Sequence, residues 1–435
     1  MMDLRTLDHE PLDSRFKGLP SRAVGVPLNG LGALGLNLLN DDLPLPAAVL
    51  RQSAIDHNSR WMRAFTQEAG VALCPHGKTT MAPQLFARQL VDGAWGLTAA
   101  TAAHVRVYRR FGVPRILLAN QLVGQANIDI VFDELRADPD FDFYVLVDSQ
   151  ASLDRLREAV RRKSPGRPLQ VLMEVGAMGG RAGVRSMEEG VALGRAIAAA
   201  VPEVALRGIE AFEDVFGRTD AARVELSVHA MLDTVAQLAR TGCDENWFAP
   251  GDVILSAGGS SFFDIAAQAL TAVQAARRVK AVLRSGCYLT HDSLHYERMQ
   301  ERMKGRAGSQ WNSVKGPGLR AALEVWGYVQ SVPEPTRAIC TLGKRDVSYD
   351  IDLPHPLWWF RKGEHSAPQP APHGLRVTAL NDQHAYVDAD AALGLKVGDM
   401  LGFGISHPCS TFDKWPLLFA VDDDYRVVGG VRTFF

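Results

Sequence analysis

Short apolar runs alternate with longer amphipathic stretches from residue 45 to about residue 300, and this alternation predicts βα units around a parallel sheet. Because eight parallel strands that are buried on both faces can close a ring, the pattern favours an α/β fold built on a (β/α)8 TIM barrel. An open doubly wound sheet is the alternative, although no GxGxxG motif follows any of the strands. The expected strands are 71–76, 94–99, 115–120, 142–148, 169–175, 206–212, 252–257 and 281–289, and the clearest expected helices are 83–92, 150–163, 186–201 and 223–241.

The pattern changes after about residue 310. The apolar runs become short, rich in β-branched and aromatic residues, and separated by Pro, Gly and Asp, which is typical of antiparallel strands. We therefore expect a barrel domain over residues 45–310 and a mostly antiparallel β domain over residues 311–435. Residues 1–44 are expected to join the β domain and to supply a strand to it.

Composition narrows the class of ligand and the compartment. Net charge is only −2 and no long basic block occurs, so neither a nucleic acid nor an acidic membrane is an expected partner, and the ligand is expected to be small. The N-terminus is too charged for a signal peptide, and no run of about 18 apolar residues occurs. The five cysteines form no CxxC pair, so we expect no disulfides and a cytoplasmic protein.

In a barrel of this kind, functional side chains are expected at the carboxyl ends of the strands. The first strand ends in CPHGKTT, which places Lys78 at the mouth of the barrel. A lysine there is either an ordinary solvated residue or an amine that forms a Schiff base with a carbonyl cofactor, which requires partial desolvation. His76 points to the same side of an extended strand and either tunes that site or only packs.

Two loops have the composition of a phosphate site. Glycines let a phosphate approach backbone N–H groups, serine hydroxyls add donors, and the loops after the last two strands of a barrel often bind phosphate. Tight turns use the same residues. A third Gly-rich loop, 176–183, carries one arginine, which either lies on the surface or lies beside a cofactor ring. The candidates are Gly258, Gly259, Ser260, Gly286, Cys287 and Tyr288 for the phosphate and Arg181 for the ring.

A His-x-Cys pair in the β domain is a candidate metal site. His407 and Cys409 are two residues apart, so both side chains lie on one face of an extended segment. Such a pair is often incidental, and two ligands cannot complete a structural zinc site. They could hold a catalytic metal whose open positions take water and substrate, and a thiolate favours zinc over magnesium or calcium.

Five segments together resemble a known family. CPHGKTT, EVGAMGGRAGV, LRSGCYLTHD, NDQHAYV and SHPCSTFD, in this order from residue 74 to residue 413, are similar to motifs of the D-serine dehydratase and D-threonine aldolase group. These are fold-type III, alanine racemase-like pyridoxal-phosphate enzymes. The resemblance implies a barrel plus a β domain, and usually a homodimer.

The resemblance also implies roles for individual residues. Lys78 would hold pyridoxal phosphate, Arg181 would face the pyridine nitrogen and weaken the electron sink, and His407 and Cys409 would bind a divalent metal, zinc or else manganese. The glycines, Ser260, Cys287 and Tyr288 would surround the phosphate, with His76 close to the cofactor.

The chain departs from the family pattern at four positions. It has Cys74 where the motif has Arg, Thr80 where it has His, Gln383 where it has Glu, and Phe212 where a Tyr is common. These differences do not alter the predicted cofactor. They leave the identity of the substrate open. Four aromatic residues either enlarge the pocket or only pack: Phe262, Phe263, Trp358 and Trp359.

The first expectation is a metal-assisted β-elimination on a D-amino acid with a β-hydroxyl, such as D-serine, to a 2-oxo acid and ammonia, with Lys78 as general base. Cys409 favours this reading, since dehydratases of the family have Cys there and aldolases have Asp. Retro-aldol cleavage to glycine and an aldehyde is the second hypothesis. A metal-free amino-acid racemase is the third. A pyridoxal-phosphate carrier or a scaffold protein is a non-enzymatic alternative, against which the β domain with its His-x-Cys pair argues.

Overall fold

Eight parallel strands form the barrel, so the fold class predicted from the sequence is confirmed. The computed structural model describes residues 2–216 and 221–435. Neighbouring strands follow the order β2-β9-β8-β7-β6-β5-β4-β3, and all the pairs are parallel. The strands are β2 (Ala72–Leu73), β3 (Leu97–Ala99), β4 (Arg115–Gln121), β5 (Asp142–Val147), β6 (Leu169–Val175), β7 (Val204–Ala211), β8 (Val253–Ala257) and β9 (Val279–Leu283).

Backbone hydrogen bonds close the ring between its first two strands. The N–H of Trp95 donates to the carbonyl of Leu73 at 2.7 Å, and the N–H of Thr98 donates to Pro75 at 2.9 Å. A parallel bridge between His76 and Thr98 continues this contact toward the barrel mouth. The carboxyl ends of the strands therefore meet at one rim.

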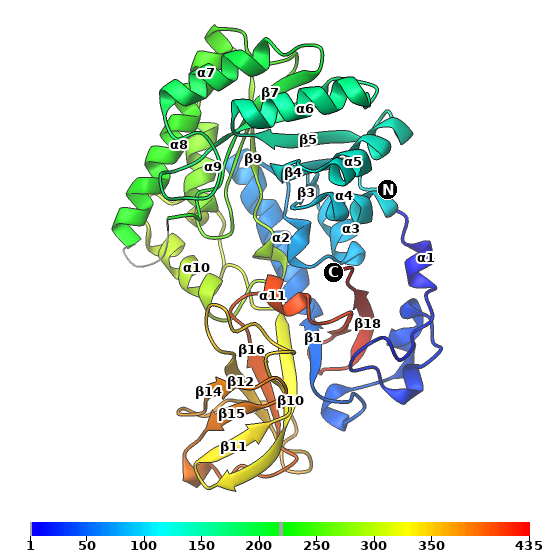
Figure 1. Ribbon diagram of the computed structural model, residues 1–435. Coiled ribbons are helices and arrows are strands. Elements are labelled where there is room, and N and C mark those ends of the chain that lie inside the picture. Colours follow the sequence, from blue (N-terminus) through cyan, green and yellow to red (C-terminus); the bar gives the residue numbers. More distant parts are fainter. Residues whose placement is uncertain (1, 217–220) are drawn as a thin grey trace.

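Helices surround the barrel (Figure 1), and each expected helix is present within a few residues. In α6 the buried residues Leu153, Leu156 and Ala159 recur every three residues, which gives the helix one apolar face, and the Ser149 side chain caps its first turn. The helices are α2 (Gln52–Ala69), α3 (Pro83–Val91), α4 (Ala102–Arg110), α5 (Gln125–Ala137), α6 (Gln150–Arg162), α7 (Met187–Ala198), α8 (Ala221–Asp244), α9 (Phe263–Thr271) and α10 (His295–Gly305).

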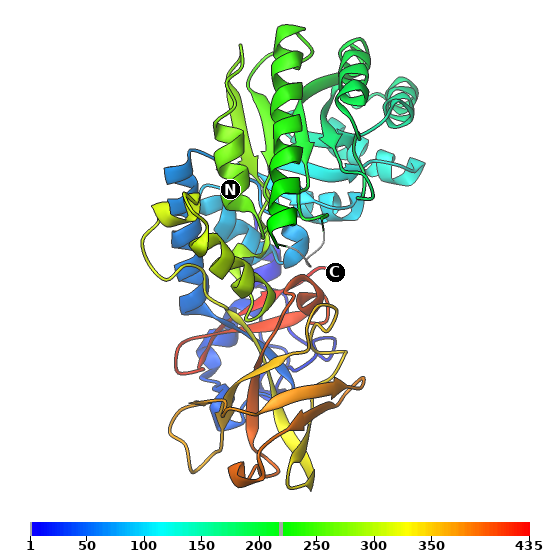
Figure 2. The same cartoon turned by 90° about the vertical axis from the view of Figure 1, so that its left-hand side faces the viewer.

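The β domain lies below the barrel in both ribbon views (Figures 1 and 2). Its pairs are antiparallel except for β1 with β17, and the short helix α11 (Cys409–Phe412) lies at the junction with the barrel. Its strands are β1 (Ala47–Arg51), β10 (Leu323–Glu334), β11 (Arg337–Cys340), β12 (His355–Phe360), β13 (Gln369–Pro370), β14 (Arg376–Leu380), β15 (Ala385–Asp388), β16 (Met400–Gly404), β17 (Leu417–Val421) and β18 (Val427–Arg432).

The first segment of the chain packs on this domain without adding a strand. Residues 2–44 contain α1 (Arg5–Asp8), 3-10 turns and two isolated bridges, Pro11–Pro27 and Asn37–Arg426. Its buried leucines share an apolar core with β1, β17 and β18. The strand expected here is instead β1, which directly follows the segment and pairs with β10 and β17.

Within the described residues, no helix is long and apolar enough to cross a membrane.

Candidate active site

A cavity of about 210 Å³ opens where the strands of the barrel end, beneath residues of the β domain. The end of β4 and the loops after β2, β3, β6, β7, β8 and β9 contribute to its wall, and the β domain adds Ile351, His407 and Cys409. The cavity brings together nine of the residues expected from the sequence: His76, Lys78, Arg181, Gly259, Ser260, Gly286, Cys287, His407 and Cys409.

Lys78 enters the cavity from a 3-10 turn, Gly77–Thr79, that follows β2. A side chain at Gly77 would collide with the Tyr108 hydroxyl, so glycine lets the turn pack tightly on α4. His76 Nδ1 is buried without a hydrogen-bond partner, which fits a ligand that supplies one. Burial, with the nearby charge of Lys78, holds the pKa of His76 well below its usual range, so the imidazole is neutral.

Gly286 lets the loop after β9 lie against the lysine turn. A Cβ atom at Gly286 would lie 2.7 Å from both the Cβ and the carbonyl oxygen of His76, and 2.8 Å from Thr79 Oγ1. Real Cβ atoms essentially never come this close, so any side chain would push the two loops apart. Glycine at this position therefore fixes the separation between Lys78 and the loop expected to hold phosphate.

Replacing Gly286 with alanine is expected to lower the free energy of unfolding by about 1–3 kcal/mol, the usual range for overpacking. Denaturant unfolding of the full chain measures this. The matched control is Gly305→Ala, because a Cβ atom there meets nothing within 4 Å. Equal stability of the two variants would contradict the tight contact at Gly286.

The two glycines after β8 are held by the carboxylate of Glu213, which follows β7. Glu213 Oε2 accepts the N–H of Gly258 at 3.0 Å, and Oε1 accepts that of Gly259 at 2.5 Å. These two amides are therefore satisfied within the protein. The Ser285 hydroxyl ties the loops after β8 and β9 together through the carbonyls of both glycines, at 3.0 and 2.8 Å.

Two residues expected at the phosphate do not line the cavity. Gly258 has a φ of +83° and turns behind Gly259, where a Cβ atom would contact Leu283 at 2.5 Å. Tyr288 is only 3% exposed and packs in the hydrophobic core, because the chain forms a 3-10 turn over Cys287–Leu289 instead of continuing the strand. The cavity wall here consists of Gly259, Ser260, Gly286 and Cys287, and Ser260 Oγ accepts the Cys287 N–H at 3.3 Å.

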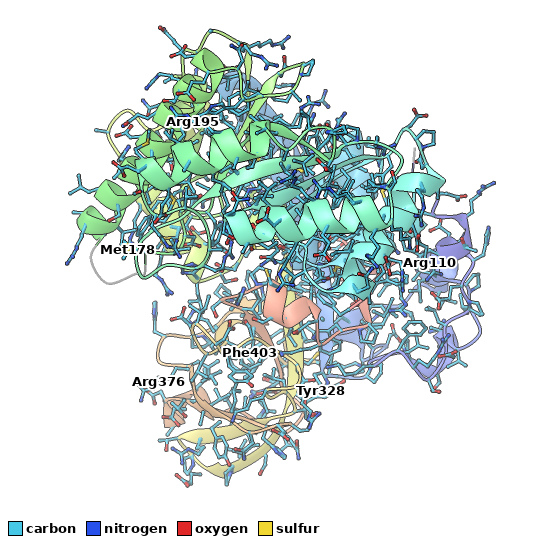
Figure 3. The ribbon with its side chains drawn as sticks, turned by 45° about the horizontal axis from the view of Figure 1, so that its top comes forward. Arg110, Met178, Arg195, Tyr328, Arg376 and Phe403 are labelled. Carbon is cyan, nitrogen blue, oxygen red and sulfur yellow. The ribbon has the colours of Figure 1, made fainter. Side chains whose placement is uncertain are left out.

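Arg181 reaches the cavity from a loop that folds back on itself. Side chains at Gly176 or Gly183 would collide with the backbone of the opposite arm, so both glycines are required for the close approach. The guanidinium carbon of Arg181 lies 4.8 Å from the centre of the Phe212 ring, and Nη2 lies 3.9 Å from Glu174 Oε1. The tip of the loop faces solvent: Met178 is 83% exposed (Figure 3).

Buried charges lie beneath the cavity, inside the barrel. Arg284 is ion-paired with Glu210 and also donates to the carbonyl of Ala211 at 2.6 Å. Burial raises the pKa of Glu210 to about 8, and the attraction of Arg284 opposes this rise. Glu174 lies opposite Glu210 in the β6–β7 register, and burial raises its pKa as well. Glu210 therefore holds Arg284 in place, while Glu174 lies near the half-exposed Arg181.

His407 and Cys409 lie on the cavity wall that belongs to the β domain. His407 Nδ1 contacts Asp350 Oδ2 at 2.6 Å, and Ser410 Oγ donates to Asp350 Oδ1 at 2.9 Å. Burial acts to raise the pKa of Asp350, but the contacts with His407 and Ser410 outweigh it, so the pKa is lowered. This carboxylate orients the ring and leaves Nε2 free to act as a ligand.

The Cys409 thiol is surrounded by groups that favour its ionised form. Cys409 Sγ lies 3.8 Å from Cys287 Sγ and 3.5 Å from Thr79 Oγ1. The hydrogen bond with Cys287 lowers the pKa of Cys409 to about 7 against the effect of burial, with help from Thr79 and Lys78. Thiolate and imidazole are the donors that zinc prefers. In residues 2–216 and 221–435 no three His, Cys, Asp or Glu side chains form a metal site, so a metal here would retain positions for water and substrate.

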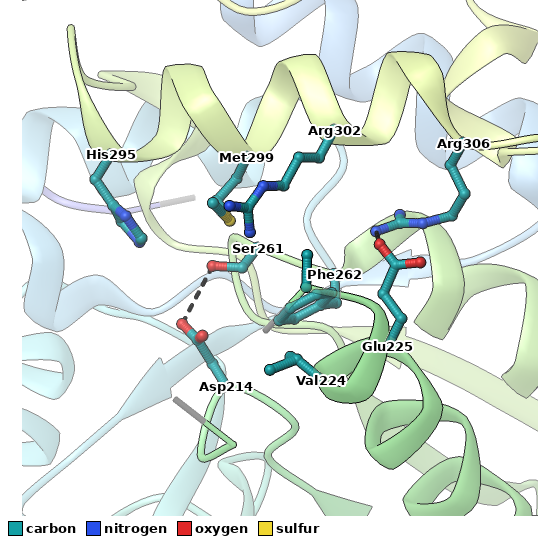
Figure 4. Close-up of a pocket in the computed structure, with 10 residues that line it drawn as sticks. Asp214, Val224, Glu225, Ser261, Phe262, His295, Met299, Arg302 and Arg306 are labelled. Atoms are coloured by element: carbon teal, nitrogen blue, oxygen red, sulfur yellow. Dashed lines mark hydrogen bonds and ion pairs between the residues drawn. The ribbon is translucent and has the colours of Figure 1, made fainter. Parts of the chain in front are cut away.

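A much smaller cavity, of about 20 Å³ (Figure 4), shares one residue with the main one. Asp214 belongs to the walls of both cavities and accepts a hydrogen bond from Ser261 Oγ at 3.2 Å. The volume suits about one water molecule. Phe262 lies in its wall, whereas Phe263, Trp358 and Trp359 line neither cavity.

Several residues in the wall of the main cavity, or in contact with that wall, were missed from the sequence. Those after β7 and β9 lie where the strand-end rule applies, so that rule gave a signal for Asp214, Glu213 and Arg284. Tyr296 on α10 and Asp350 in the loop before β12 lie outside any motif and gave none. The segment around Gln383 forms the β14–β15 hairpin and does not line the cavity.

Comparison with known protein families finds two matches along the chain. Residues 50–251 match the alanine racemase N-terminal domain, and residues 322–421 match the putative serine dehydratase domain. The chain is 27% identical to D-threonine aldolase from Arthrobacter sp, over 87% of this chain and 89% of that protein. It is 23% identical to 3-hydroxy-D-aspartate aldolase from Paracoccus denitrificans (strain Pd 1222), over 86% of this chain and 88% of that protein.

Solved structures share the fold. D-threonine aldolase from Filomicrobium marinum superposes with a TM-score of 0.73 at 20% identity, covering 92% of this chain and 97% of that one. D-threo-3-hydroxyaspartate dehydratase from Delftia sp. HT23 superposes with a TM-score of 0.66 at 21% identity, covering 92% and 99%. Together with the two matched domains, these likenesses show a pyridoxal-phosphate-dependent lyase with an alanine racemase-like fold, similar to the D-serine dehydratase and D-threonine aldolase group.

Proposed function

We propose that the protein removes water from a D-3-hydroxy amino acid such as D-serine, giving a 2-oxo acid and ammonia, with pyridoxal phosphate and a divalent metal. One observation carries the proposal. Lys78 from the barrel and the pair His407 and Cys409 from the β domain line the same cavity of about 210 Å³. An amine that can act as a base and a pair of metal ligands are thus available to one substrate.

The cavity suits pyridoxal phosphate. Bound there, the cofactor supplies an electron sink that makes the proton on the substrate Cα acidic. Lys78 Nζ would hold the cofactor and then move that proton, since Lys78 lines the cavity and its side chain is exposed. Gly259, Ser260, Gly286 and Cys287 would surround the phosphate, and Arg181 would lie at the ring.

The β-domain wall suits zinc, with manganese as the alternative. His407 Nε2 and Cys409 Sγ would hold the ion, and its Lewis acidity would make the β-hydroxyl a better leaving group. Asp350 keeps the His407 ring oriented, and Thr79 holds the Cys409 sulfur at 3.5 Å. Cys409 supports dehydration over aldol cleavage, because the family resemblance assigns Cys at this position to dehydratases.

Replacing Asp350 with alanine is expected to weaken metal binding about 10- to 100-fold, because the His407 ring loses the carboxylate that orients it. Competition with a chromogenic chelator measures the affinity. Asp352→Ala is the matched control, since that carboxylate lies in the same loop but pairs with Arg298. An affinity that falls equally in both variants would show a general loss of structure, and no fall in either would contradict the role of Asp350.

Aldol cleavage is the second candidate, because the two curated relatives compared above are named as aldolases. Product analysis separates the reactions. Incubation with D-serine and D-threonine is expected to release ammonia and a 2-oxo acid, whereas glycine and an aldehyde without ammonia would establish the aldolase. Interconversion of D- and L-isomers that a chelator leaves unchanged would instead establish a racemase.

We also propose that the enzyme is a cytoplasmic homodimer, as the family resemblance implies. Light scattering on the purified full chain tests the dimer.

A further inference from the structure

Two thiols from different domains face each other across the cavity. Cys287 follows β9 of the barrel, Cys409 begins α11, and their sulfur atoms lie 3.8 Å apart although 122 residues separate them in the chain. Thr79 Oγ1 contacts both, at 3.8 Å from Cys287 Sγ and 3.5 Å from Cys409 Sγ. The hydroxyl keeps both side chains turned toward one point.

The other cysteines have no such arrangement. Cys74 contacts Thr98, and Cys74, Cys243 and Cys340 are buried in apolar clusters away from the cavity. Cys287 and Cys409 are the cysteines that line the cavity among the residues described for it. Among the five cysteines, Cys287 and Cys409 are therefore the two whose sulfur atoms lie close together at the cavity.

We propose that Cys287 and Cys409 form a reversible disulfide that determines whether Cys409 can hold the metal. This inference rests on the proposed function, in which Cys409 is a metal ligand. A disulfide requires a sulfur separation of about 2.05 Å, so the two atoms have to approach by roughly 1.8 Å from their observed 3.8 Å. A sulfur that is bonded to another sulfur is no longer a thiolate and does not bind zinc.

A peroxide supplies the oxidising equivalents. One thiol attacks hydrogen peroxide, the O–O bond breaks, and the sulfur becomes a sulfenic acid with release of one water. The second thiol then attacks that sulfur, the S–O bond breaks, the S–S bond forms, and a second water leaves. Overall, two thiols and one peroxide give one disulfide and two waters, so two electrons pass from the sulfurs to the peroxide oxygens.

Exposure assigns the order of these steps. Cys287 is only 4% exposed, whereas Cys409 is partly exposed at the cavity surface. Peroxide therefore reaches Cys409 first, and Cys287 is the thiol that resolves the sulfenic acid. Without Cys287, further oxidation leads to a sulfinic acid, which thiol reductants do not reverse.

The experiment treats the zinc-loaded full chain with hydrogen peroxide. Peptide mapping without reduction is expected to show a cross-link between the peptides of Cys287 and Cys409, lighter by two hydrogen atoms than the separate peptides. A chromogenic chelator is expected to detect release of the zinc. Dithiothreitol followed by zinc is expected to restore most of the bound metal.

Two variants make the result specific. Cys287→Ser is expected to form no cross-link and to recover about fivefold less zinc after dithiothreitol, with two oxygen atoms added at Cys409. Cys340→Ser, which replaces a fully buried thiol of the β domain, is expected to behave like the parent protein. Absence of the cross-link in the parent, or equal recovery of zinc by the parent and Cys287→Ser, would overturn the inference.

The outcome also separates this inference from the proposed function. Zinc-containing, active lyase that never forms the cross-link would overturn the inference alone. Protein that forms the cross-link but binds no metal and cleaves no D-3-hydroxy amino acid would overturn the proposed function and, with it, control of metal binding by the disulfide.

Discussion

Replacing Lys78 with alanine is expected to lower kcat/KM by at least about a thousandfold, which corresponds to roughly 4 kcal/mol of transition-state stabilisation. Among the described residues that line the cavity, Lys78 is the single lysine. It follows β2 and lies beside the loops that are expected to bind the phosphate. The variant would lose both the amine that holds the cofactor and the base that moves the Cα proton.

Two measurements separate these effects from loss of folding. The visible absorbance of the purified protein is expected to disappear in Lys78→Ala, while denaturant unfolding changes by less than about 1 kcal/mol, because Lys78 is exposed to the cavity. Lys304→Ala is the matched control, since its ammonium pairs with Glu301 on the surface of α10. Activity of Lys78→Ala within tenfold of the parent would exclude the proposed role of Lys78 as cofactor-binding amine and general base.

The barrel could be predicted because its strands are buried on both faces and read as continuous apolar runs. All eight predicted strands are present, and the largest error is at 281–289, where the strand ends at Leu283 and a 3-10 turn follows over Cys287–Leu289. That turn removes Tyr288 from the cavity. Apolar runs locate a strand but do not show where the loop at its end begins.

Long-range pairing could not be predicted from the same pattern. β1 pairs with β10, which lies about 270 residues later in the chain, and with β17 beyond it. Its run of buried residues, Ala47–Leu50, is equally consistent with either sheet. β1 belongs to the β domain because it pairs with β10 and β17. Hydrophobic periodicity does not show which strand another strand pairs with.

The sequence indicated which residues would meet at one rim where a motif lies at a strand end, but not where two distant segments meet. Lys78, Ser260 and Gly286 follow strands, so the barrel alone brings them to one rim. Glu213 satisfies amides 45 and 46 residues away, and Asp350 orients a ring 57 residues away. Such contacts depend on loop conformation, which a single sequence does not specify.

Replacing His407 with alanine is expected to remove the metal and to lower kcat/KM by about a thousandfold, because Lewis-acid assistance to the leaving hydroxyl contributes several kcal/mol. One thiolate, Cys409, would then be the sole remaining ligand of the proposed pair. Metal analysis and product formation on the same sample give both quantities. The matched control is His373→Ala, an exposed histidine in the loop before β14.

The two readouts distinguish a catalytic metal from a bystander. If His407→Ala loses the metal and the activity together while His373→Ala keeps both, the ion acts on the reacting hydroxyl. Excess zinc is then expected to restore activity only partly, since the ring that Asp350 orients is absent. A metal-free His407→Ala protein that retains kcat/KM within tenfold of the parent would show that Lys78 and the cofactor suffice, and would favour the racemase over either lyase.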